Sequence, residues 1–222
     1  TLFQTKSKET PIVKLNTILR EFVSNNGGKV QAWDSLLKKH GGDYAAAFSV
    51  ITKTIDIATG KERKDTLPEE VGHFALEGLG EGNILVQNVL NLIEQLDYRV
   101  ELAKIDPDYV ELYKEDELAL KKELAGKYLG QAIIGKFESK DNSILGQLAR
   151  TFKLLIDKFV SLFKNAGQQR IDEIKREIEK QTNGLVEKIL NKENLGLTFS
   201  TNPSNPVFYQ TASGKKAKEQ DH

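Results

Sequence analysis

The residues best suited to chemistry lie in one short stretch, TLPEEVGHFALEGLG, which runs from Thr66 to Gly80. If this stretch is helical, Glu69 and His73 lie on the same face, one turn apart. A carboxylate and an imidazole at this spacing can bind one metal ion, as the two histidines of an H-E-x-x-H helix do. Glu70 lies beside them, where that motif carries its general base. The stretch therefore predicts a metal site with a glutamate in the place of the first histidine.

A site of this kind needs a third ligand, which we expect from a later helix. Our candidate is Glu123 in KKELAGKYLG, because the small residues Ala125 and Gly126 would let this helix approach the first one closely. Glu117 in EDELAL is the competing choice. A second carboxylate ligand would weaken the Lewis acidity of zinc and shift the preference toward harder divalent metals.

The same residues also have an interpretation without a metal. Glu69 and Glu70 in a first helical turn are favoured by the helix dipole, and His73 next to an aromatic residue is typical of a half-buried histidine. The other two histidines, His40 before two glycines and the terminal His222, fit a helix end and a chain end. The residues alone leave both interpretations open.

Several elements are predicted to position these side chains. We expect helices over residues 11–23 and 84–96, a helix from Thr66 with a capping box to Glu69, and a long helical stretch over residues 109–137. The β-branched stretch AFSVITKTIDIATGKE predicts one strand of about ten residues, closed by a turn at Thr-Gly-Lys. A second, shorter helix is expected from the spacing of its apolar residues, Val30, Trp33, Leu36 and Leu37.

The C-terminal third differs in pattern. The apolar stripe Ile144–Phe163, the break KNAGQQ and the isoleucine-rich stretch that follows predict a helical hairpin over residues 143–191. Lysines beside aromatic residues leave a membrane-surface helix at 144–163 as the alternative to core packing. Residues 196–222 are polar and predict an extended tail, ordered only where a partner holds it.

The predicted fold is mainly α with a small β element, divided along the chain into four parts. These parts are an N-terminal helical region at 1–42, a compact unit at 43–140, the helical hairpin at 141–192 and the tail at 193–222.

Composition excludes several classes of function. Lysine plus arginine and aspartate plus glutamate both number 32, so no global field favours nucleic acid. The absence of cysteine excludes disulfides, thiolate metal sites and cysteine nucleophiles. No signal peptide and no run of roughly 18 apolar residues is found. The chain also lacks methionine, so we expect that Thr1 follows a cleavage site or an upstream segment.

Residues 43–137 resemble the zincin-like domains of large polyvalent proteins from bacteriophages and mobile elements. The resemblance rests on the T-L-x-E-E-x-x-H helix after a strand and on a downstream helix with E-x-x-G-x-x-L-G, where the family often has E-x-x-A-x-x-L-G. It implies that Glu70 is the general base, that His73 and Glu123 are metal ligands, and that Glu69 occupies the place of the first histidine.

The resemblance also implies a function. It indicates a virion-packaged protein segment that acts in the virion or the host cytoplasm, contacts other protein chains of a larger assembly, and carries a weak or degenerate metallopeptidase site for a peptide substrate. The metal would be zinc or another divalent cation. The alternative is a non-enzymatic structural or cargo protein that docks onto a larger virion assembly by its hairpin and tail.

Overall fold

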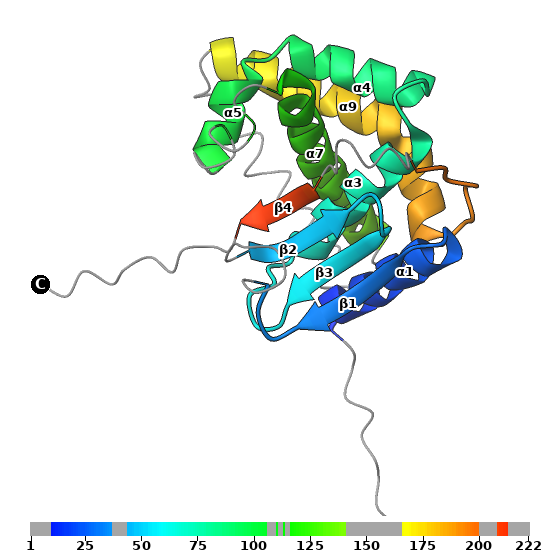
Figure 1. The fold of residues 1–222 in the computed structure, drawn as a ribbon. Helices are drawn as coiled ribbons and strands as arrows, with labels where there is room; N and C mark the ends of the chain where they lie inside the picture. The colour runs from blue at the N-terminus through cyan, green and yellow to red at the C-terminus, as the bar shows by residue number, and fades with distance from the viewer. Residues whose placement is uncertain are drawn as a thin grey trace, which may run out of the picture.

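The computed structural model describes residues 10–36, 44–105, 116–140, 166–199 and 208–212, together with positions 110 and 113. As predicted, the fold is mainly α with a small sheet (Figure 1). The helices are α1 (Pro11–Asn25), α3 (Thr66–Leu79), α4 (Ile84–Glu94), α5 (Tyr98–Ile105), α7 (Glu117–Lys140) and α9 (Ala166–Leu190). The strands are β1 (Lys29–Trp33), β2 (Tyr44–Ser49), β3 (Thr54–Ala58) and β4 (Phe208–Ala212).

The sheet has the strand order β1-β3-β2-β4. β2 and β3 form an antiparallel hairpin in which Phe48 lies opposite Ile55. The prediction of one strand of about ten residues is therefore wrong. The chain reverses between the strands, where Lys53 takes a φ of 53° and Ile51 is 45% exposed. The turn after β3 was predicted correctly, with Gly60 at a φ of 80°.

The predicted second helix is also wrong, because residues 29–33 form strand β1, parallel to β3. Val30 and Trp33 have helical spacing, but β3 offers backbone partners along the whole segment, which decides in favour of a strand. The Trp33 indole Nε1–H donates to Asp56 Oδ1 at 2.7 Å, which ties the two strands together. Leu36 is buried in a small cluster against Ala58, while Leu37 lies outside the described residues.

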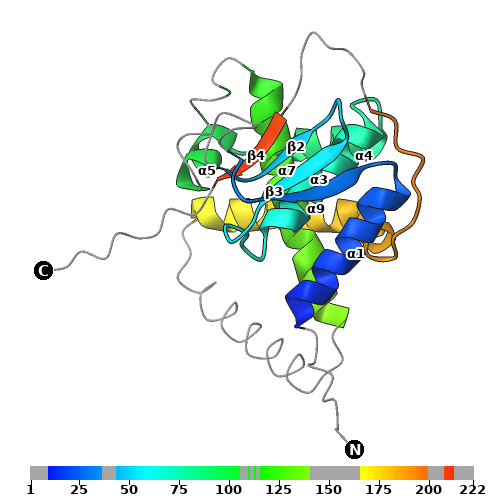
Figure 2. The same cartoon turned by 60° about the horizontal axis from the view of Figure 1, so that its bottom comes forward.

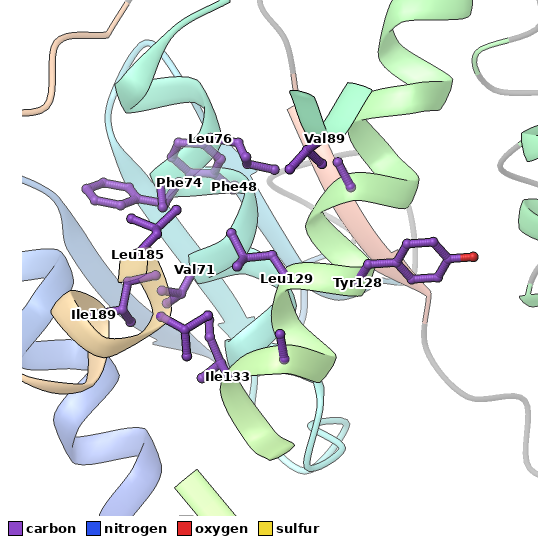
Figure 3. Packing of buried hydrophobic residues seen from close by; sticks show 14 of the residues in the cluster. Phe48, Val71, Phe74, Leu76, Val89, Tyr128, Leu129, Ile133, Leu185 and Ile189 are labelled. Carbon is purple, nitrogen blue, oxygen red and sulfur yellow. The ribbon is translucent and has the colours of Figure 1, made fainter. Parts of the chain in front are cut away.

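Helix α3 lies at the centre of the molecule, between the sheet and α7. It packs against β2 and β4 on one side and against α7 on the other, and α7 in turn packs against α9 (Figures 1 and 2). The rings of Phe48 from β2 and Phe74 from α3 meet edge to face, with centroids 5.6 Å apart. Side chains of α3, α7 and α9 converge in the core, among them Val71, Leu129, Ile133, Leu185 and Ile189 (Figure 3). Any side chain that points from α3 toward α7 is therefore shielded from solvent.

Within the predicted helical stretch 109–137, helix α7 covers the part from Glu117 onward, position 110 is also helical and position 113 lies in a turn. Residues 109, 111–112 and 114–115 lie outside the described part of the chain. The Asp116 carboxylate accepts the backbone N–H of Ala119 at 2.9 Å, which satisfies one of the free donors of the first turn. The short helix α5 (Tyr98–Ile105) was not predicted. Among the described residues, no helix has both the length and the apolar character needed to span a membrane.

The second arm of the predicted hairpin is helix α9, whose buried residues include Ile174, Ile178 and Ile189. It begins at Ala166, so most of the expected break KNAGQQ lies inside the helix. The first arm, Ile144–Phe163, lies outside the described residues, and its membrane or core role stays a prediction.

The prediction of a tail that needs a partner is wrong for two described segments. β4 (Phe208–Ala212) pairs antiparallel with β2, so its backbone hydrogen bonds are made within the chain itself. Upstream, the Thr198 N–H donates to the carbonyl of Gly78 at the end of α3, at 2.9 Å. The Leu195 N–H donates to Asn26 Oδ1 at 2.7 Å. The C-terminal region is thus part of the fold that surrounds α3.

Candidate metal centre

The first turn of α3 does not use the predicted capping box. Thr66 Oγ1 accepts the N–H of Arg63 at 2.9 Å, and Asp65 occupies the N-cap position. Glu69 does not reach back to the helix start and is instead buried, with 4% of the residue exposed. The capping box fails because the interior contains a stronger partner for this carboxylate.

Three glycines let the backbones of α3 and α7 approach each other closely where the helices cross. A Cβ added at Gly72 of α3 would lie 2.6 Å from the carbonyl oxygen of Gly126 in α7. A Cβ at Gly126 would lie 2.2 Å from the ring of His73, and one at Gly130 would lie 2.8 Å from the Cα of Glu69. Any larger residue at these positions would separate the helices or displace the side chains between them.

The crossing brings together the three predicted ligands. One ligand atom each from Glu69, His73 and Glu123 can be chosen so that all lie within 4.8 Å of one another. The Nε2 of His73 is 3.8 Å from Oε2 of Glu123, and these two side chains are 1% and 0% exposed. The competing candidate Glu117 is not in this group, because its side chain is 66% exposed and lies 3.7 Å from the guanidinium of Arg99.

A residue that we did not predict completes the group. The Lys127 ammonium, from the turn of α7 that follows Glu123, donates to Oε1 of Glu69 and lies 3.6 Å from Oε1 of Glu123. Lys127 is only 4% exposed. Its i,i+4 spacing to Glu123 is a recognisable ion-pair signal, but surface helices carry the same signal frequently.

Burial controls the protonation of this cluster. Desolvation, with help from the Lys127 charge, holds the pKa of His73 well below its usual value, so its imidazole is neutral at pH 7. Desolvation also raises the pKa of Glu123 to about 8 and raises the pKa of Glu69, while Lys127 opposes both shifts. Burial alone would lower the pKa of Lys127, but Glu69 and Glu123 beside it raise the pKa above its usual value. Lys127 is therefore charged.

Glu70, the predicted general base, is fully buried in the same region. The pKa of the Tyr113 hydroxyl is raised, first by burial and then by the negative charges of Glu123 and Glu70. The charge of Glu70 also acts on Lys127. Glu70 is therefore within electrostatic reach of the group formed by Glu69, His73 and Glu123, but it is not one of the three converging ligands.

The donor set fits a divalent metal ion in its chemistry. Two carboxylates and a neutral imidazole are ligands of zinc, and the extra carboxylate favours harder metals. Glu123, whose pKa is raised to about 8, would release a proton to become a ligand. Among the described residues, neither oxygen of Glu123 accepts a hydrogen bond, although the Lys127 ammonium lies 3.6 Å from Oε1. With bonds of about 2.0–2.2 Å, tetrahedral ligand atoms lie about 3.4 Å apart. The group could hold an ion after a modest contraction.

Comparison of the chain with protein-family models, with curated proteins and with solved structures found no match.

Proposed function

We propose that this chain is a zincin-like domain in which Glu69, His73 and Glu123 bind a divalent metal ion, in a weak or degenerate metallopeptidase site. One observation carries the proposal. Three side chains of ligand type, from two helices with 37 residues between them, converge in the interior at a crossing lined by glycine. These are the residues that the resemblance to zincin-like domains singled out.

The chain's own residues would have distinct roles in such a site. The side chains of Glu69, His73 and Glu123 would hold the ion, which when bound supplies Lewis-acid polarisation of a substrate carbonyl group. Glu70 would accept a proton as the general base. In its neutral state His73 has one ring nitrogen without a proton, as metal ligation requires.

Two features support a degenerate site rather than an efficient peptidase. Glu69 adds negative charge where the family motif has a histidine, which weakens Lewis acidity. In addition, the three ligands are at most 4% exposed, and an extended peptide would need an open approach to them. We therefore expect slow hydrolysis or none.

The biological setting of the proposal comes from the resemblance of residues 43–137. By this resemblance the chain is a segment of a phage- or mobile-element-encoded protein, packaged in a virion and delivered to the host cytoplasm among other protein chains. The second candidate is a structural or cargo protein without chemistry. The Glu69–Lys127 ion pair favours it, because an internal ammonium can satisfy a buried carboxylate without any metal.

Metal binding to the purified chain tests the proposal. Zinc affinity measured by calorimetry on chelator-treated protein should fall by at least about tenfold in H73A and in E123Q, since each removes a ligand. The matched control is E117Q, which changes the exposed glutamate on the same helix and should bind like wild type. Binding that is unchanged in both H73A and E123Q would contradict the proposal and favour the structural candidate.

A further inference from the structure

The proposed metal site does not explain why the ammonium group of Lys127 lies inside it. The Lys127 ammonium bonds to one ligand carboxylate, Glu69, and lies 3.6 Å from another, Glu123. Its burial is nearly complete, and both of these carboxylates belong to the metal-ligand group. A buried lysine has to be held by negative charge, and here the carboxylates that hold it are the ones a metal would need.

We infer that Lys127 occupies the cation position of this centre, so that its ammonium group competes with a divalent ion for Glu69 and Glu123. The inference rests on the proposed metal site and states how that site is regulated by its own side chain. A divalent ion between the two carboxylates would meet the ammonium at close range, and like charges at this distance in a buried site repel strongly. Metal can enter only if Lys127 moves away.

The crossing of the helices leaves Lys127 little choice of position. The side chain leaves α7 between Gly126 and Gly130, the two glycines whose missing Cβ atoms lie over His73 and the backbone of Glu69. The lysine therefore starts at the closest contact of α7 with α3, and its ammonium is buried among the ligands.

The pairing also accounts for the unusual first position of the motif. A histidine at position 69 would offer Lys127 no negative charge, whereas the carboxylate of Glu69 accepts directly from the ammonium. Glu69 and Lys127 thus form a matched pair in which a fixed internal cation replaces part of the charge that a metal would supply.

The test compares zinc affinity, by calorimetry and by competition with a chromogenic chelator, in wild type and Lys127→Met. We expect K127M to bind zinc at least about tenfold more tightly, and the gain to disappear in K127M/H73A. The matched control is Lys121→Met on the same helix, because Lys121 pairs with Glu94 at 3.1 Å and bonds to no ligand. K121M should bind like wild type.

K127M leaves Glu69 buried without its cation, so the metal-free variant could fail to fold. The comparison is then made between E69H and E69H/K127M, which carry no unpaired carboxylate at position 69. Here too the variant without the lysine should bind zinc at least about tenfold more tightly.

The outcomes separate the two proposals. Equal or weaker binding after removal of Lys127, together with loss of binding in H73A, overturns the competition and leaves the metal site intact. If wild type, K127M and E69H/K127M all fail to bind zinc, the metal site itself is wrong and the competition falls with it.

Discussion

The crossing of α3 and α7 can be tested with one methyl group, added by Gly126→Ala. The new Cβ would lie 2.2 Å from Cε1 of His73, where ordinary contacts begin at 3.4 Å, so the ring or the helix has to shift by about 0.8–1.2 Å. His73 is 1% exposed and cannot swing into solvent. Overpacking of this kind costs about 1–3 kcal/mol, against a gain of up to about 1 kcal/mol from replacing glycine in a helix.

The same helix provides the control, because a Cβ at Gly135 of α7 meets nothing within 4 Å. Gly135→Ala should raise the free energy of unfolding by about 0.4–1 kcal/mol through backbone entropy alone. We expect G126A to be less stable than G135A by about 1–3 kcal/mol, measured by urea unfolding followed by circular dichroism.

Zinc affinity provides a second measurement on the same two variants. A shift of the His73 ring by about 1 Å exceeds the roughly 0.5 Å tolerance of a preorganised site, so G126A should bind zinc more weakly than wild type and G135A should not. If G126A is as stable as G135A and binds zinc equally well, the helices do not cross at Gly126 as described, and the argument for a site at this crossing fails.

Three further predictions concern the cluster and the packing around α3. Burial raises the pKa of Glu123 from its usual 4.5 to about 8. In protein kept metal-free by a chelator, the protonated Glu123 therefore contributes to the stability of the folded state, fully below pH 4.5, and this contribution is lost as pH rises through about 8. E123Q should lack this loss in urea unfolding between pH 5.5 and 9, and an equal loss in both proteins would refute the assignment. Asn26→Ala removes the acceptor of the Leu195 N–H and should lower the free energy of unfolding by about 1–3 kcal/mol in the same assay; no change would mean that the C-terminal segment is held elsewhere. Phe74→Ala empties a fully buried site beside Phe48 and should cost about 3–5 kcal/mol by thermal or urea unfolding, so a cost under about 1 kcal/mol would place this ring outside the core.

Local spacing was enough to predict several elements correctly. Helices α1, α3 and α4 follow from apolar residues at helical spacing and from the proline and glycine at their ends. The shared face of Glu69 and His73 follows from i,i+4 geometry alone, since a helix places such residues one turn apart whatever surrounds it. These features depend on neighbours within about one or two turns of the chain.

The strands were harder to predict because their partners are distant in the sequence. β1 pairs with β3, about 25 positions further along the chain, and its helical spacing of apolar residues carried no sign of that partner. The C-terminal β4 lies in a stretch that we predicted to be a tail, but the open edge of β2 supplies its backbone hydrogen bonds. A segment of five residues forms a strand when a neighbouring sheet edge can pair with its backbone. The spacing of apolar residues within the segment carries no information about that distant edge.

The sequence by itself determined which side chains could form a site: Glu69 and His73 share one helix face, and Glu123 has small residues beside it. Only the tertiary structure decided that the site also contains a cation. The i,i+4 spacing of Glu123 and Lys127 suits a solvated surface as well as a buried cluster. The glycine-lined crossing of α3 and α7 brings the lysine into the interior, where it bonds to Glu69. A charge acts strongly on neighbouring groups when burial removes the water that would otherwise solvate it. Burial is a property of the assembled fold.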